Sequence, residues 1–182
     1  MIPDGATLFV SDVHLDSERP ELTARFLDFL GEQARRAASL YILGDLFEYW
    51  IGDDCPGALG ETVAAALKSL ADSGVPIHFM HGNRDFLLGP DYAAAAGMTL
   101  LDDPAPLVLD GQLFLLSHGD ALCTDDIEYQ QLRARVRDPE WQRGFLAQDQ
   151  ATRSQQAGAA RSASKQHTAA ADQAIMDVNQ EA

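Results

Sequence analysis

The 182-residue sequence is poor in basic side chains, with 13 Lys and Arg against 28 Asp and Glu. The formal net charge of −15 lies wholly in residues 1–126, since these carry 6 basic and 21 acidic residues whereas residues 127–182 carry 7 of each. General binding to nucleic-acid backbones needs surplus Lys and Arg, so we expect no nucleic-acid partner. Two interpretations of the excess carboxylates remain open: a solvated surface that keeps the protein soluble, or carboxylates that converge on metal cations.

Cysteine and long apolar runs are also scarce. The two cysteines, Cys55 and Cys123, lack the spacing of a metal site. No apolar run approaches the ~18–20 residues that span a bilayer. Residues 1–10 contain no basic segment before an apolar stretch, so we expect no secretory signal. Together these absences predict reduced thiols and a cytosolic protein.

Strand-like and helix-like segments alternate over the first two thirds of the sequence. Short apolar runs predict strands, and apolar residues at helical spacing predict helices. Strands are expected at residues 6–11, 40–43 and 77–80, helices at 20–34, 59–72 and 91–96, and a hairpin over 107–117 around Asp110-Gly111. This order indicates an α/β layered domain with a largely parallel sheet.

The last third has a different character. Residues 127–147 predict one helix that carries four arginines, at positions 133, 135, 137 and 143. These arginines fit either an anionic membrane surface or substrate phosphate, or a solvated helix face. Residues 148–174 are rich in Gln, Ala, Ser and Thr, which fits a mobile lid, a helical segment or a disordered stretch.

Four polar clusters follow the ends of predicted strands. They are SDVHL (11–15), GDLFE (44–48), HGNRD (81–85) and SHGD (117–120). In an open α/β sheet the ligand crevice lies outside the carboxyl ends of the strands, so these side chains should meet there. Mixed carboxylate, imidazole and amide donors suit Mn²⁺ or Zn²⁺. An Asp can bridge two such ions, and a two-ion site clamps an in-line displacement at phosphorus.

Each cluster taken alone also has an ordinary structural interpretation. Asp12 alone fits a helix N-cap, and Gly82-Asn83 alone fits a turn. His14 and His118 alone would be unremarkable surface or core histidines. Their joint occurrence, each directly after an apolar strand, favours one shared metal site.

The order D-x-H, G-D, G-N-x-[HDE] and H-G resembles the calcineurin-like metallophosphoesterases. It is matched by Asp12-His14, Gly44-Asp45, residues 82–85 and His118-Gly119. Longer strings resemble the branch of this family that acts on UDP-2,3-diacylglucosamine in lipid A biosynthesis: LYILGDLFEYWIGDD (40–54), HGNRDFLLG (81–89), LSHGDALCTDD (116–126) and IMDVNQEA (175–182). The resemblance implies a layered α/β sandwich with a core at 1–126, a helical lid at 127–174 and a return to the core beginning at 175–182.

The resemblance also implies roles for individual residues. Asp12 and His14 would bind one divalent cation, Asn83 and His118 a second, and Asp45 would bridge the two, with Mn²⁺ as the expected metal. Many relatives carry a His after the Asn that can act as a general acid. Here that position is Arg84, whose guanidinium can hold phosphate oxygens bidentately. The implied substrate contacts are Asn83, Arg84, Asp126 and Ser164, and the implied catalytic residues are Asp45 and Arg84.

The implied reaction is hydrolysis of the pyrophosphate bond of UDP-2,3-diacylglucosamine. Water activated by the two cations would attack the phosphorus on the UMP side, giving UMP and 2,3-diacylglucosamine 1-phosphate. The implied location is the cytoplasmic face of the inner membrane, with peripheral contact to its surface.

One departure from the family leaves alternatives open. A later G-H-x-H motif, with one His for each cation, is absent from the sequence. We therefore expect a truncated chain that lacks the last strands and one ligand for each metal. The alternatives are a non-catalytic metal- or nucleotide-binding fragment and a metallophosphoesterase for another nucleotide diphosphate.

Overall fold

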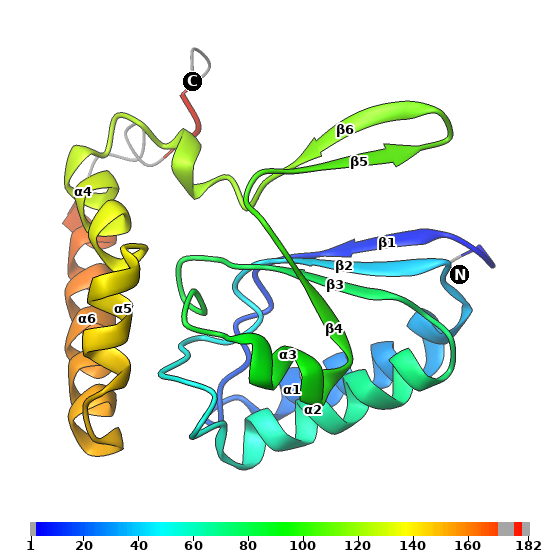
Figure 1. Ribbon diagram of the computed structural model, residues 1–182, viewed down its shortest axis with the longest axis horizontal. Coiled ribbons are helices and arrows are strands. Elements are labelled where there is room, and N and C mark those ends of the chain that lie inside the picture. Colours follow the sequence, from blue (N-terminus) through cyan, green and yellow to red (C-terminus); the bar gives the residue numbers. More distant parts are fainter. Residues whose placement is uncertain (1–2, 171–176, 180–182) are drawn as a thin grey trace. The chain divides into compact units, whose positions relative to one another are not determined.

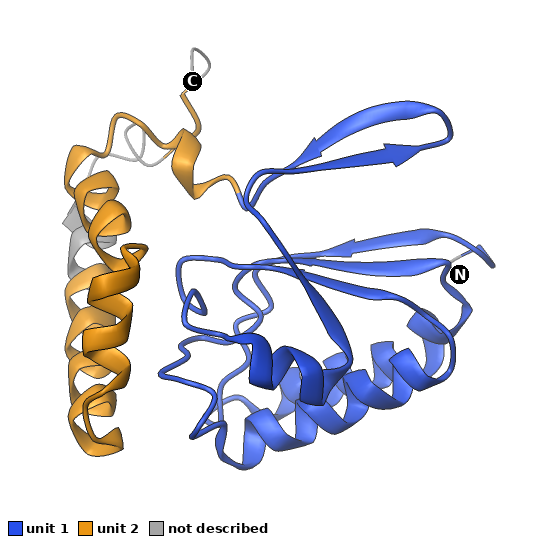
Figure 2. Cartoon of the chain, viewed as in Figure 1, with its two compact units in different colours: residues 1–118 blue, residues 119–182 orange. Residues whose placement is uncertain are grey.

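The computed structural model describes residues 3–170 and 177–179, with the backbone alone for residues 165–170. The chain divides into two compact units, residues 1–118 and 119–182 (Figure 2). The expected division after residue 126 stays a prediction. The expected return to the core at 175–182 lies outside the described residues except for 177–179.

Unit 1 is built on a four-stranded parallel sheet (Figure 1). Its strands, in spatial order, are β1 (Thr7–Val10), β2 (Ser39–Leu43), β3 (Ile77–Met80) and β4 (Met98–Leu101). The predicted α/β class is confirmed, and so are the first three strands. The fourth strand was not predicted, although its run MTLL lies between Gly97 and Asp102-Asp103 and carries the same signal of an apolar segment bounded by turn residues.

Three helices cover one face of this sheet: α1 (Pro20–Asp28), α2 (Gly57–Asp72) and α3 (Pro90–Ala96) (Figure 1). The core between them is apolar, with Leu40, Ile42, Val63, Leu67 and Phe79 each fully buried. The expected helix over residues 20–34 is shorter than predicted. It ends at Asp28 and continues as a π turn, Phe29–Gln33, which contains Gly31, the poorest helix former in this segment.

The opposite face of the sheet carries a row of stacked rings. Tyr41 stacks on Phe9 at 5.2 Å and on His78 at 4.5 Å, following the register of β1, β2 and β3.

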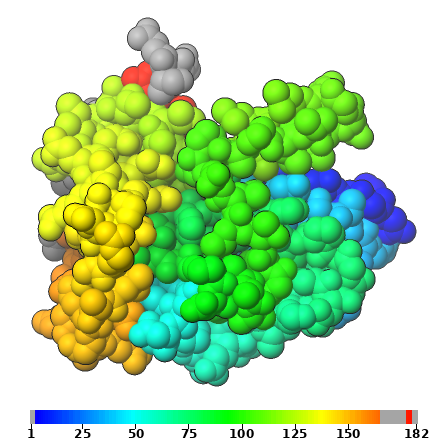
Figure 3. All heavy atoms as spheres, in the orientation of Figure 1, coloured from blue at the N-terminus to red at the C-terminus, as the bar shows by residue number. Residues whose placement is uncertain are grey.

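The predicted hairpin is confirmed as β5 (Ala105–Leu109) paired antiparallel with β6 (Gln112–Leu116). Both turn residues, Asp110 and Gly111, have positive φ, as a tight hairpin turn requires. The hairpin lies at the surface of unit 1 (Figure 3), and its apolar residues Val108, Leu113 and Leu115 are 64%, 74% and 70% exposed.

The described part of unit 2 contains a 3-10 turn, Asp120–Leu122, and three α-helices: α4 (Ile127–Val136), α5 (Pro139–Leu146) and α6 (Gln150–Ala170). The prediction of one helix over 127–147 is wrong. The helix breaks before Pro139, which has no N–H to donate, and Asp138 restarts it by accepting from the backbone N–H of Glu140 and Trp141, both at 2.9 Å.

Within the polar stretch 148–174 the helix α6 covers Gln150–Ala170, and residues 171–174 lie outside the described part. None of the helices in the described part is long and apolar enough to cross a membrane.

Candidate metal centre

The loops that follow β1 and β2 run side by side. Three backbone N–H groups of the first loop donate to carbonyls of the second: Asp12 to Gly44 at 3.1 Å, His14 to Asp45 at 2.9 Å and Leu15 to Leu46 at 2.8 Å. Asp12, His14 and Asp45 have φ of 54°, 51° and 54°, a left-handed conformation that is uncommon outside glycine. Such conformations cost energy and persist where neighbouring structure enforces them, which is common at functional sites.

The Asp85 carboxylate joins the β2 loop to the loop after β3. It is fully buried and accepts four backbone N–H groups: Leu46 at 2.7 Å, Gly82 at 2.9 Å, Asp45 at 3.3 Å and Phe47 at 3.4 Å. A single carboxylate therefore fixes the backbone of both loops.

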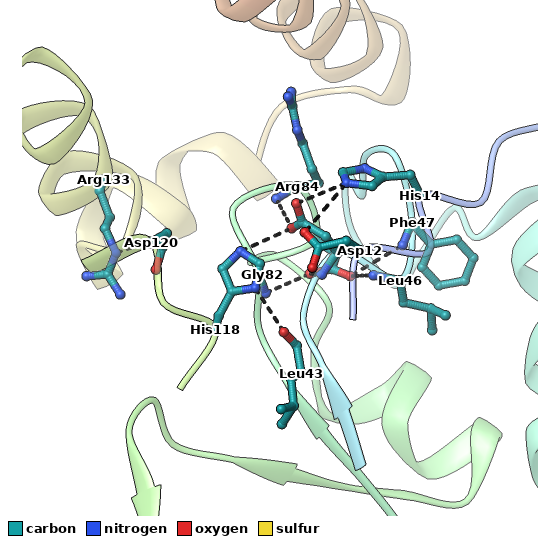
Figure 4. Close-up of polar contacts among 12 residues, drawn as sticks. Asp12, His14, Leu43, Leu46, Phe47, Gly82, Arg84, His118, Asp120 and Arg133 are labelled. Atoms are coloured by element: carbon teal, nitrogen blue, oxygen red, sulfur yellow. Dashed lines mark hydrogen bonds and ion pairs between the residues drawn. The ribbon is translucent and has the colours of Figure 1, made fainter. Parts of the chain in front are cut away.

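The Asp45 side chain lies at the centre of the cluster. Its Oδ2 is 3.6 Å from Nε2 of His14, and its Oδ1 is 3.9 Å from Nε2 of His118. Asp12 Oδ1 lies 3.9 Å from the same nitrogen of His14. Figure 4 shows Asp12, His14 and His118 turned toward one group of carboxylate oxygens. Asp12, Asp45 and His118 each offer one ligand atom, and these three atoms lie within 4.8 Å of one another.

The Asn83 amide lies against the Asp45 carboxylate. Turned so that its nitrogen faces Asp45, it donates to Oδ2 at 2.5 Å and to Oδ1 at 3.1 Å. Turned the other way, the amide places its oxygen toward the Asp45 carboxylate oxygens. Two such acceptors side by side are arranged as ligands of one shared cation would be. The amide is thus within reach of any ion that Asp45 binds.

Burial governs the charge of Asp45. It raises the pKa of Asp45 to about 6, and the neighbouring Asp85 charge adds to the rise. The Arg84 backbone N–H, at 2.9 Å from Oδ1, and the two histidines lower the pKa and so oppose this. A bound cation acts in the same direction as these groups, because positive charge favours the ionised carboxylate.

Both histidines present Nε2 to the carboxylates and hold Nδ1 against an acceptor. Nδ1 of His118 donates to the Leu43 carbonyl at 2.9 Å, which leaves Nε2 as the lone-pair nitrogen. Nδ1 of His14 lies 3.0 Å from Glu48 Oε2. This donor set, with two imidazoles, two carboxylates and an amide, fits borderline divalent cations.

The structure brings together all five residues predicted as metal ligands: Asp12, His14, Asp45, Asn83 and His118. The Arg84 side chain points away from the carboxylates in Figure 4, while its backbone contacts Asp45. The predicted substrate contacts Asp126 and Ser164 belong to unit 2, so the geometry of unit 1 does not include them. Asp126 caps α4 by accepting from the Tyr129 N–H at 3.0 Å, and Ser164 lies in α6.

Two residues of this centre were absent from the predicted set. Asp85 and Glu48 stand inside the clusters HGNRD and GDLFE, and each makes its contact across loops that are distant in sequence. The sequence could have indicated these two residues only through their position beside predicted ligands. Their roles depend on how deeply each carboxylate is buried and which groups it contacts, and both depend on the fold.

Comparison with known proteins gives related sequences over most of the chain. A family model described as calcineurin-like phosphoesterase matches residues 6–167. A UDP-2,3-diacylglucosamine hydrolase of Stenotrophomonas maltophilia K279a is 60% identical over 87% of this chain and 64% of its own length. One of Escherichia coli O7:K1 is 54% identical over 97% of this chain and 74% of its own length.

The chain therefore spans somewhat less than two thirds of the Stenotrophomonas relative. Among solved structures, a nuclease MPE of Pseudomonas putida matches with a TM-score of 0.40 and 27% identity, over 56% of this chain and 49% of that one.

Proposed function

Because the chain belongs to the calcineurin-like phosphoesterase family, we propose that it takes part in hydrolysing the pyrophosphate bond of UDP-2,3-diacylglucosamine. The products are UMP and 2,3-diacylglucosamine 1-phosphate, an intermediate of lipid A biosynthesis. Support for this substrate comes from relatives of 54–60% identity that bear the name UDP-2,3-diacylglucosamine hydrolase. Support for the reaction comes from Asp45, whose two oxygens face imidazoles from two different loops.

The proposed centre holds two divalent cations. Asp12 and His14 would hold the first, Asn83 and His118 would hold the second, and Asp45, whose oxygens face both histidines, would serve both. Members of this family use divalent metals, and Mn²⁺ is the ion that we propose here. Ligand atoms on one such ion are at most about 4.2 Å apart, since each lies about 2.1 Å from it. The spacings of 3.6 and 3.9 Å from the Asp45 oxygens to the two histidines are compatible with that limit.

Such cations would supply Lewis-acid stabilisation of the phosphorus oxygens and a water of lowered pKa. The chain's own residues hold the geometry. Asp85 fixes the backbone on either side of Asp45, and the Arg84 N–H donates to Asp45 Oδ1. The Arg84 guanidinium is proposed to contact phosphate oxygens bidentately and so to orient the pyrophosphate. Asp126 and Ser164 are proposed to contact the nucleotide-sugar portion.

Unit 2 is proposed to cover the lipid and to touch the cytoplasmic face of the inner membrane. Its helices expose the apolar side chains of Ile127, Leu132 and Leu146, at 65%, 53% and 39%. Arg135 and Arg143 are also exposed, so apolar and cationic groups are both available to an anionic lipid surface. Arg133 has a different role, because its Nε donates to Asp120 at 2.9 Å within the unit.

The test measures UMP release from UDP-2,3-diacylglucosamine with Mn²⁺ present. Asp45→Asn should lower the rate by at least about 100-fold, because it removes the charge shared by both metal sites. The matched control is Asp102→Asn, an exposed carboxylate of unit 1, which should retain the wild-type rate.

Two results would contradict the proposal. One is release of UMP by Asp45→Asn at the wild-type rate. The other is equal hydrolysis of acylated and deacylated UDP-sugars, which would favour a phosphoesterase for another nucleotide diphosphate. Counting bound Mn²⁺ per chain addresses the remaining alternative, since less than one ion per chain indicates a non-catalytic fragment.

A further inference from the structure

We propose that Glu48 is a positioning residue that keeps the ring proton of His14 on Nδ1, so that Nε2 is free to bind a metal. The inference rests on the proposed role of His14 as a ligand. Glu48 is not one of the proposed ligands, and it acts through the imidazole.

The contact is direct. Oε2 of Glu48 lies 3.0 Å from Nδ1 of His14, and the Glu48 side chain is only 12% exposed. The Nδ1 atom is buried and makes no hydrogen bond within the described part of the chain, and Glu48 is the carboxylate that lies beside it. The two atoms are at hydrogen-bond distance but do not form a hydrogen bond in this structure, so the proposed bond requires one of the two side chains to rotate.

This contact decides which nitrogen faces the cluster. A neutral imidazole carries one proton, and the hydrogen bond made by one nitrogen determines the state of the other. Free histidine favours the proton on Nε2, the atom that here lies 3.6 Å from Asp45 and 3.9 Å from Asp12. Without an acceptor at Nδ1, the preferred tautomer would therefore present N–H rather than a lone pair to the metal site.

Glu48 is itself held in place from two directions. Its backbone N–H donates to the Leu15 carbonyl at 3.0 Å, within the ladder that joins the loops after β1 and β2. Arg19 Nη2 lies 3.8 Å from Glu48 Oε2 and donates to the His14 carbonyl at 2.5 Å. Arg19 thus links the Glu48 carboxylate to the backbone of His14, the residue that Glu48 orients.

The experiment compares the wild-type chain with Glu48→Ala and Glu48→Gln. Nitrogen-15 NMR of the histidine rings in the metal-free chain reads the tautomer, and His14→Gln identifies the His14 signals. The wild type should show Nδ1–H, and Glu48→Ala should shift His14 toward Nε2–H. Mn²⁺ affinity, read from the electron paramagnetic resonance signal of free Mn²⁺, should fall about 10–100-fold in Glu48→Ala. Glu48→Gln, which keeps the acceptor oxygen but not the charge, should retain the tautomer and lose a few-fold in affinity.

The control is Glu18→Ala, which removes an exposed carboxylate four residues after His14 and should leave both readouts unchanged. If Glu48→Ala keeps the wild-type tautomer and Mn²⁺ affinity, the inference about Glu48 is overturned but the proposed metal centre is not. If that variant does not fold, Glu48→Met decides, because it keeps the length of the side chain without an oxygen acceptor, and a wild-type tautomer and affinity in Glu48→Met overturn the inference. A wild-type chain that binds no Mn²⁺ would instead overturn the proposed metal centre.

Discussion

Two neighbouring carboxylates of the centre, Asp45 and Asp85, are buried in contrasting surroundings. Asp85 accepts four backbone N–H groups, whereas the oxygens of Asp45 face two imidazoles and an amide. Burial raises the pKa of Asp85, and the N–H groups of Gly82, Phe47, Leu46 and Asp45 lower it. A carboxylate with that many donors has a structural role, while Asp45 retains lone pairs for a cation.

Asp85→Asn should therefore destabilise the protein. The amide brings one oxygen and an NH₂ group into a space that holds only donors, so at least one buried N–H loses its acceptor. The free energy of unfolding should fall by about 2–4 kcal/mol, measured by urea denaturation. Asp102→Asn, at an exposed position, should change it by less than about 0.5 kcal/mol. Equal stability of the Asp85 and Asp102 variants would show that the four contacts contribute little.

His78, in the ring stack of the sheet, gives the protein a pH-dependent stability. Burial lowers the pKa of His78 below its usual 6.5, so the unfolded chain takes up the proton first as the pH falls. The stabilising contribution is present above about pH 6.5 and is lost as the pH falls toward the folded pKa. His78→Phe keeps a ring against Tyr41 and should reduce the loss of stability between pH 7.5 and 5.5.

The control for this prediction is Tyr41→Phe, which keeps the stack and the titrating group and should follow the wild-type pH dependence. Urea denaturation at both pH values provides the comparison. A His78→Phe variant whose stability falls with pH as steeply as the wild type would contradict the assignment.

At the scale of elements, the sequence predicted what depends on local pattern. Apolar runs followed by polar clusters located β1, β2 and β3, and the parallel topology then placed their carboxyl ends together. The break before Pro139 was missed although a proline is itself a sequence signal that a helix breaks, whereas the π turn at Gly31 was missed because the apolar spacing of residues 20–34 continues through it. The closeness of the loops depends on backbone contacts between residues far apart in sequence. From the sequence alone, Asp85 and Glu48 are neighbours of predicted ligands in the chain. That Asp85 fixes the loop backbone and that Glu48 contacts His14 follow only from the fold.

Gly82 shows how closely these loops approach. A Cβ at this position would lie 2.0 Å from Asp45 Oδ1 and 2.4 Å from the Asp45 backbone nitrogen. Gly82→Ala should displace Asp45, weaken Mn²⁺ binding by about tenfold or more and cost about 1–3 kcal/mol of stability. Gly31→Ala is the control, because a Cβ there meets no atom within 4 Å. Wild-type Mn²⁺ affinity in Gly82→Ala would show that the loops separate readily.

At the scale of the whole molecule, negative charge and the proposed ligands occur in the same part of the chain. The net charge of −15 belongs to residues 1–126, and all five proposed ligands lie within unit 1. Within the described part of unit 2, Phe145 is the single buried apolar side chain, whereas unit 1 has an extensive apolar core. Stabilisation by a cation should therefore act on the folding of unit 1.

Mn²⁺ should raise the melting temperature of the chain, and EDTA should reverse the rise. A cation that binds only the folded state at 100 times its Kd adds about 2.7 kcal/mol of stability. For a chain of this size that corresponds to an increase of roughly 5–10 °C, measurable by calorimetry.

General screening of the acidic surface would also stabilise the protein, but NaCl at equal ionic strength would reproduce that effect. Asp45→Asn separates the two causes, since it removes one charge of many and yet should abolish the Mn²⁺-specific increase. An equal increase in wild type and Asp45→Asn would assign the effect to the acidic surface and not to the metal centre.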